Sequence, residues 1–320
     1  MFVAMGVGAW SVGMYHLFTH AFFKALLFLG SGSVILAMHH EQDIRHMGGL
    51  RTKIPFTYWT MVIGTLALTG FPLFAGYFSK DAIISAAYAG RNPAAAYGWI
   101  MTLLAAGLTA FYSWRLIFKV FHGAPHDRAH FEAAHESPLT MLVPLAVLAA
   151  GSVFAGLPFL SYFVGPGVEG FFRDSLALGH GNTVLEDMER VGVVVEFAPT
   201  ALMVVGLGIA YLFYIRDPRL PVELARQHGV LYRFLLNKWY FDEVYDALLV
   251  KPTLWLGRLL WKRGDGWLID GFGPDGVSRW VLDMTRNVVR LQTGYMYHYA
   301  FAMLIGVAGF ITWFMFSGAQ

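Results

Sequence analysis

Long apolar blocks, separated by short charged loops, constrain this sequence more than any other feature. The hydrocarbon core of a bilayer is about 30 Å thick, so a membrane-spanning helix needs about 20 mostly apolar residues. Charged residues make up 14% of the chain, whereas a soluble domain carries about a quarter. These charges are too few to cover a water-facing surface. The sequence therefore predicts an all-α fold, a polytopic bundle of transmembrane helices.

Six segments have the length and composition of a span. The second is too long for one straight helix, and Gly70, Pro72 and Gly76 lie in its middle. Proline removes a helical hydrogen bond and glycine loosens the backbone, so we expect a discontinuous helix there rather than an ordinary proline kink. The predicted spans are Met14–Met38, Ile54–Ala89, Ala94–Phe121, Pro138–Val164, Phe197–Ile215 and Leu291–Phe316.

Basic residues are concentrated in alternate loops. They follow the first and fifth spans and border the third, and the positive-inside rule places these loops in the cytoplasm. The C-terminus is therefore predicted on the opposite, non-cytoplasmic face. The residues that define the pattern are Arg45, Arg51, Lys53, Arg115, Lys119, Arg128, Arg216, Arg219 and Arg226.

The region between the last two spans is amphipathic. Val277, Trp280, Val281 and Met284 recur at helical spacing with charged residues between them. We expect a long amphipathic lateral helix along the membrane surface or against other subunits, with a small soluble domain as the alternative. The expected organisation is the tail of a preceding helix at 1–13, a transmembrane bundle of about five spans at 14–216, the lateral region at 217–290 and a transmembrane anchor at 291–320.

Three titratable residues share one face of the first predicted span. His16, His20 and Lys24 lie at i, i+4 and i+8, so successive members are offset by only ~40° and together cover ~12 Å of the helix axis. A lysine inside a bilayer costs several kcal/mol unless it faces water or a partner, and histidine exchanges protons near neutral pH. We interpret the three as a proton relay facing a hydrated interior. Taken singly, each also has a structural explanation, as a buried histidine or a lysine reaching the interface.

A second candidate site follows the break in the second span. Lys80 and Asp81 are embedded, because apolar sequence continues after them as far as Ala89. Intramembrane ionisable residues are functional by default, so we expect Lys80 to exchange protons while the carboxylate modulates it. The alternative is an interfacial ion pair that ends the span.

Several other site classes receive no support. The absence of cysteine excludes thiol catalysis and cysteine-ligated metal centres, and no nucleotide-binding glycine motif is present. A net charge of +2 gives no reason to expect nucleic-acid binding. The spacing of His122, His126, His130 and His135 is irregular, so we interpret this segment as a solvated loop rather than a metal site.

Three stretches resemble subunit L of respiratory complex I, the proton-translocating NADH:quinone oxidoreductase, within the antiporter-like family. They are YHLFTHAFFKALLFLGSGSVILAMHHEQDIRHMGGL (Tyr15–Leu50), PLFAGYFSKD (Pro72–Asp81) and WYFDEVYDALLVKP (Trp239–Pro252). The first is similar to the central signature of the antiporter-like subunits and the second to their broken helix. The third is similar to the start of the lateral helix of subunit L.

The resemblance implies a membrane-arm subunit that translocates protons coupled to electron transfer from NADH to quinone. In that family the position of Lys24 is a central lysine, those of His16 and His20 adjoin its proton path, and that of Lys80 is the terminal lysine, followed by the acidic position of Asp81. NADH, flavin, iron–sulfur clusters and quinone are expected on other subunits, so this chain is expected to hold no cofactor and no metal. The expected partners are the other membrane-arm subunits, above all the neighbouring antiporter-like subunit, and the lipid bilayer of a bacterial inner (cytoplasmic) membrane.

The chain departs from the family at its N-terminus. The family's preceding helices, with their glutamate–lysine pair, are missing, and Met1–Trp10 resembles the end of an internal helix. We therefore expect a C-terminal fragment that contains only the second half-channel. A subunit of a multi-subunit sodium/proton antiporter is the alternative function, because it shares the His–Lys and broken-helix signatures. A structural clamp without transport is the third.

Overall fold

The computed structural model describes residues 1–176 and 181–318, which form helices and connecting loops without strands. The predicted all-α class is thus confirmed. Residues 177–180 of the expected bundle and 319–320 of the expected anchor lie outside the described residues. The chain divides into two compact units, Met1–Gln227 and His228–Gln320.

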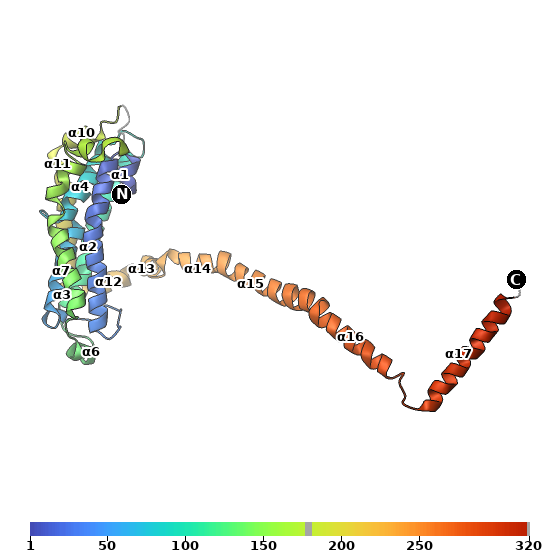
Figure 1. Ribbon diagram of the computed structural model, residues 1–320. Coiled ribbons are helices and arrows are strands. Elements are labelled where there is room, and N and C mark those ends of the chain that lie inside the picture. The colour runs from blue at the N-terminus through green and yellow to red at the C-terminus, as the bar shows by residue number, and fades with distance from the viewer. Residues whose placement is uncertain (177–180, 319–320) are drawn as a thin grey trace. The chain divides into compact units, whose positions relative to one another are not determined.

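The first unit is a helical bundle (Figure 1). Its α-helices are α1 (Phe2–Gly6), α2 (Trp10–Ala37), α3 (Pro55–Thr69), α4 (Ala75–Ala89), α5 (Ala95–Phe121), α6 (Arg128–Ala133), α7 (Leu139–Phe154), α8 (Leu160–Phe163), α9 (Val168–Phe172), α10 (Val184–Glu189), α11 (Val193–Tyr211) and α12 (Leu220–Gln227). Shorter helical turns are η1 (Leu50–Thr52), η2 (Leu157–Phe159), η3 (Arg173–Ser175) and η4 (Leu212–Arg216).

Most of the predicted spans are helices of the required length. Four helical segments of the described chain are long and apolar enough to cross a membrane, and the pair Leu139–Phe154 and Leu157–Phe163 qualifies as a fifth, bent span. The remaining predicted span, Ile54–Ala89, consists of two helices, α3 and α4, each of 15 residues. At 1.5 Å per residue neither helix alone spans a bilayer core of about 30 Å.

The break between α3 and α4 lies where the glycines and proline predicted it. Gly70 ends α3 in the left-handed conformation at φ 80°, which glycine adopts without a steric penalty. Gly76, in the first turn of α4, packs so closely that a Cβ atom there would lie 1.8 Å from the carbonyl oxygen of Ala67. The start of α4 therefore lies directly against the last turns of α3.

A second break was not predicted. The sequence predicts one span from Pro138 to Val164, but the helix bends by 56° between its two parts. Gly156 lies at the bend, and a Cβ atom there would come within 2.8 Å of the backbone of Ala75 at the start of α4. Its carbonyl oxygen accepts a 2.9 Å hydrogen bond from the hydroxyl of Tyr15 on α2. The same oxygen accepts from the backbone N–H of Phe159 at 3.0 Å, so the carbonyl group at the bend is satisfied inside the bundle.

The loops of the bundle meet in two groups, at opposite ends in Figure 1. At the end that carries α6, the loop after α2 meets the loop after α5, since Gly49 donates its backbone N–H to His122. At the end that carries α10, Arg91 forms a 2.7 Å ion pair with Asp187. The loop groups alternate along the chain, as expected for helices that cross a membrane in turn.

The second unit consists of helical segments with a non-helical link at residues 292–295, and none of its described residues is buried. Its helices contact their neighbours in sequence and follow one another along the ribbon in Figure 1. The expected amphipathic region is therefore a series of helical segments, and α17 falls within the expected anchor. The elements are α13 (Gly229–Leu236), η5 (Lys238–Tyr240), α14 (Phe241–Tyr245), η6 (Asp246–Val250), α15 (Lys251–Leu259), η7 (Leu260–Asp270), α16 (Pro274–Val289) and α17 (Met296–Ser317).

Candidate functional site

The histidines of the first predicted relay lie side by side on α2. The ring centroids of His16 and His20 are 5.6 Å apart, as the i, i+4 spacing requires. Phe23 packs against both rings, at 6.2 Å from His16 and 5.3 Å from His20. Phe23 lines the same cavity as the two histidines and Lys24.

One cavity of about 290 Å³ brings the relay together with the residue after the break. Its wall includes His16, His20 and Lys24 from α2 and Lys80 from α4. Helix α5 closes the other side, where its polar contribution is Thr102, Thr109 and Tyr112. A cavity of this size with polar groups on its walls can hold several ordered waters. The structure thus places the two sequence motifs around a common space.

Lys80 is bound to the end of the neighbouring half-helix. Its Nζ donates a 2.8 Å hydrogen bond to the carbonyl oxygen of Thr69, in the last turn of α3. The final carbonyl groups of a helix have no partner within the helix and carry the negative end of its dipole. The break therefore provides an acceptor that stabilises an ammonium group facing the cavity.

Asp81 faces a different space. It lines a cavity of about 240 Å³ together with Ser85, Glu189 and Glu196, and its Oδ2 atom is buried without a hydrogen-bond partner. Consecutive residues of a helix are about 100° apart, so one side of α4 presents Lys80 and another presents Asp81. The structure therefore separates the two side chains that the sequence places next to each other.

The serine before Lys80 connects the two helices of the site. Ser79 is fully buried, and its Oγ lies 3.0 Å from Nδ1 of His16. Thr19, also fully buried on α2, donates a 2.7 Å hydrogen bond to the same oxygen. These contacts fix the start of α4 against the histidine face of α2.

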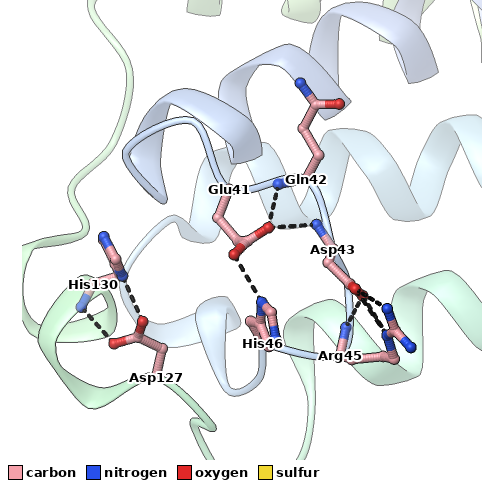
Figure 2. Close-up of polar contacts among 7 residues, drawn as sticks. All are labelled: Glu41, Gln42, Asp43, Arg45, His46, Asp127 and His130. Carbon is pink, nitrogen blue, oxygen red and sulfur yellow. Dashed lines mark hydrogen bonds and ion pairs between the residues drawn. The ribbon is translucent and has the colours of Figure 1, made fainter.

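The remaining histidines lie mainly in the loops at the α6 end. Figure 2 shows the carboxylate of Glu41 accepting from the backbone of Gln42 and Asp43 and pairing with His46. The hydrogen bond with Glu41 raises the pKa of His46. In the facing loop Asp127 pairs with His130 at 2.6 Å, and this hydrogen bond lowers the pKa of Asp127.

Members of the histidine-rich segment have separate partners. His122 lies 3.2 Å from the hydroxyl of Tyr58, and His126 lies 2.7 Å from the carbonyl oxygen of Met47. Within the described residues, no group of three or more His, Cys, Asp or Glu side chains is arranged to hold a metal ion.

Sequence reasoning missed three residues of this site. Glu196 is an acid in the first turn of α11, and the rule that flags ionisable residues within spans could have identified it. Ser79 and Thr19 give no such signal, because hydroxyl residues are frequent in membrane helices and usually bond to their own backbone. Only the contact between α2 and α4 distinguishes them.

Comparison of the sequence with known proteins shows which proteins this chain is similar to. Residues 1–111 match the family model described as "NADH:quinone oxidoreductase/Mrp antiporter, TM". The chain is 43% identical to NADH-quinone oxidoreductase subunit L of Rhodobacter capsulatus, with 100% of this chain and 54% of the relative covered. It is 38% identical to subunit L of Neisseria meningitidis, with 96% and 49% covered.

A eukaryotic relative is similar to the same extent. NADH-ubiquinone oxidoreductase chain 5 of Phytophthora infestans is 38% identical, with 95% of this chain and 46% of the relative covered. The chain spans about half the length of the curated relatives it matches. Together with the apolar helices of the bundle, these matches identify a multi-pass membrane protein.

Proposed function

We propose that this chain, which belongs to the antiporter-like family of NADH:quinone oxidoreductase membrane subunits, carries protons across the membrane. Its transport is coupled to electron transfer from NADH to quinone on other subunits. The observation that carries the proposal is the cavity that unites His16, His20, Lys24 and Lys80. Each of these side chains can gain and lose a proton, and water in the cavity can connect them.

The break between α3 and α4 controls proton transfer, because Lys80 lies beside it. Lys80 holds a proton while its ammonium group donates to Thr69, and it releases the proton when that interaction is lost. Asp81, on the same helix but in the second cavity with Glu196, provides the next acceptor. The α11 helix begins beside this cavity, at the α10 end of the bundle (Figure 1). The route therefore runs from the middle of the bundle toward that end.

The orientation and surroundings follow from the same proposal. The α6 end, with its excess of basic residues, faces the cytoplasm of a bacterium, and the α10 end and the C-terminus face the opposite side of the inner membrane. The partners are other membrane-arm subunits, including the neighbouring antiporter-like subunit, and the lipid bilayer. NADH, flavin, iron–sulfur clusters and quinone are bound elsewhere in the complex.

A sodium/proton antiporter subunit is a weaker alternative. The family description covers both classes, but the relatives compared over 95–100% of this chain carry the names of NADH:quinone oxidoreductase subunits. Those matches extend through the amphipathic region as well as the bundle.

Replacement of the two lysines tests the proposal. We expect Lys24→Met or Lys80→Met, in the full-length protein within its complex, to reduce NADH-driven proton pumping about 100-fold, because a proton-transfer group of this kind contributes about 10²–10⁴-fold. The measurement is proton uptake by inverted membrane vesicles at equal amounts of assembled complex. Lys262→Met is the matched control, since Lys262 is an exposed lysine of the second unit. Normal pumping by both bundle variants would refute the proposed function.

A further inference from the structure

The hydroxyl group of Ser79 makes three hydrogen-bond contacts, and these restrict where the hydrogens can lie. Its Oγ accepts from Thr19 at 2.7 Å, lies 3.0 Å from His16 Nδ1, and donates to the carbonyl oxygen of Ala75 at 3.3 Å. A serine hydroxyl offers one hydrogen and two acceptor positions. The three contacts can be made together in only one way.

That arrangement determines where the hydrogen of the histidine lies. If Ser79 gives its hydrogen to Ala75 and one acceptor position to Thr19, the second acceptor position remains for His16. His16 must then carry a hydrogen on Nδ1 and donate it to Ser79. In the opposite arrangement Ser79 donates to His16 and loses its contact with Ala75. Buried polar groups use their hydrogen-bonding capacity almost completely, which favours the first arrangement.

The two hydroxyl groups have no access to water that could replace these bonds. Ser79 and Thr19 are each 0% exposed. The hydroxyl of Thr19 also lies 3.2 Å from the carbonyl oxygen of Tyr15 and 3.3 Å from that of His16. If Thr19 gives its hydrogen to one of these carbonyl groups, Ser79 donates to Thr19, and His16 must still donate to Ser79. The contact also joins two helices: Thr19 and His16 belong to α2, whereas Ser79 belongs to the half-helix that carries Lys80.

We propose that Ser79, held by Thr19, is a positioning residue that keeps the hydrogen of neutral His16 on Nδ1 and leaves the lone pair of Nε2 free to take a proton from the cavity. A proton that arrives at Nε2 converts the ring to imidazolium, and its release from Nε2 restores the same neutral tautomer. The bond between Nδ1–H and Ser79 is retained in both states. The inference rests on the proposed function, because it assigns a role within that relay.

Other titratable groups share the cavity and will contribute to any pH profile. They are His20 and Lys24 from the helix of His16, Lys80 from α4, Tyr112 from α5 and the amino group of Met1. A test therefore needs an observation specific to His16 in addition to the rate of transport.

The first test is the tautomer itself. In the ¹⁵N spectrum of histidine-labelled full-length protein in lipid bilayers, the signal that disappears in a His16→Gln variant belongs to His16. We expect its neutral form to carry hydrogen on Nδ1, and we expect Ser79→Ala to transfer that hydrogen to Nε2. A wild-type His16 with hydrogen on Nε2, or a tautomer unchanged by Ser79→Ala, would overturn the inference.

The second test is transport by the assembled complex in vesicles. We expect Ser79→Ala to lower NADH-driven pumping about tenfold, the effect of one lost buried hydrogen bond, and to change its pH profile. Thr19→Val removes the supporting donor without changing the shape of the side chain and should have the same sign, whereas Thr19→Ser should retain most activity. The matched control is Ser152→Ala, because Ser152 is equally buried but bonds to Leu148 of its own helix.

The outcomes separate this inference from the proposed function. If Ser79→Ala and Thr19→Val retain the wild-type rate and pH profile while Lys24→Met abolishes pumping, the role of Ser79 is refuted and the relay stands. If Lys24→Met and Lys80→Met both pump normally, the proposed function fails. If the complex with Ser79→Ala does not assemble, the transport rates of the Thr19 variants and the tautomer of His16 in the wild-type protein still test the inference.

Discussion

The two units of this chain differ in which side chains they bury. In the first, hydroxyl groups are buried and linked across helices: Ser33 on α2 bonds to Thr57 on α3 and to Ser137. Large apolar side chains such as Phe28 and Trp59 lie on its surface. In the second unit the described residues carry apolar and charged side chains on exposed helices, and none is buried.

This difference indicates where each unit finds its stabilising contacts. The bundle has its own hydrophobic core, crossed by hydrogen bonds between hydroxyl groups, and its apolar exterior suits lipid, so its helices can be positioned by contacts within the chain. The helices α15 and α16 of the second unit are amphipathic, and none of their residues is buried. An amphipathic helix of this kind is stabilised by burial of its apolar face. We therefore expect the second unit to depend on lipid or other subunits.

Adding one methyl group to a glycine in each unit tests the comparison most strongly. A Cβ atom at Gly76 would lie 1.8 Å from the carbonyl oxygen of Ala67, so Gly76→Ala must push the two half-helices apart. Overpacking typically costs about 1–3 kcal/mol, and we expect a loss of that size in the stability of the bundle, with reduced pumping. The measurement is thermal unfolding of the purified protein in detergent.

Gly257 is the matched control in the second unit. It lies within α15, and a Cβ atom there would meet nothing within 4 Å. Gly257→Ala should therefore raise helicity by circular dichroism, since alanine is favoured over glycine in helices by about 1 kcal/mol. Equal destabilisation by both variants would show that the second unit packs as tightly as the first.

A charge placed on the apolar stripe of α16 tests whether the second unit depends on its partners, and we expect an effect of intermediate size. Trp280, 63% exposed, belongs to this stripe, and we expect Trp280→Asp to reduce assembly of the complex while the isolated protein unfolds at an unchanged temperature. The measurement is the fraction of protein in the complex on native gels. Ser278→Asp, at an exposed position on the opposite side of the same helix, controls for the added negative charge. A similar loss of assembly in both variants would argue against burial of the stripe.

The smallest effect is expected from pH on the order of the loops at the α6 end, because the groups that titrate there are exposed to solvent. The pKa of His46 is raised by the hydrogen bond with Glu41, so its contribution is complete below the usual histidine value of about 6.5 and is lost as the pH rises through the raised pKa. The pKa of Glu41 is lowered, first by the backbone N–H of Asp43. Its contribution is present above about 4.3 and is lost as the pH falls through the lowered pKa.

The loop should therefore be most ordered between about pH 4.3 and 6.5. Hydrogen exchange of the amides at 42–47, corrected for intrinsic rates, measures this order. Glu41→Gln should flatten the profile. A profile that Glu41→Gln leaves unchanged would contradict the assignment.

The sequence alone determined the features that depend on local periodicity. The 3.6-residue repeat is enough to place His16, His20 and Lys24 on one face, and Gly70 and Gly76 mark the helix break because their backbone requirements are local. Composition likewise sufficed for the all-α membrane class. The proton-transfer roles of these residues and of Lys80 and Asp81 stay predictions.

Only the tertiary structure decided which residues face each other. Lys80 and Asp81 are neighbours in sequence, yet they line separate cavities because the walls of each are completed by different helices. The bend at Gly156 and the hydrogen bond between His16 and Ser79 likewise depend on segments far apart in the chain. A sequence pattern specifies the side of a helix on which a residue lies, and the packing of the other helices specifies what lies opposite.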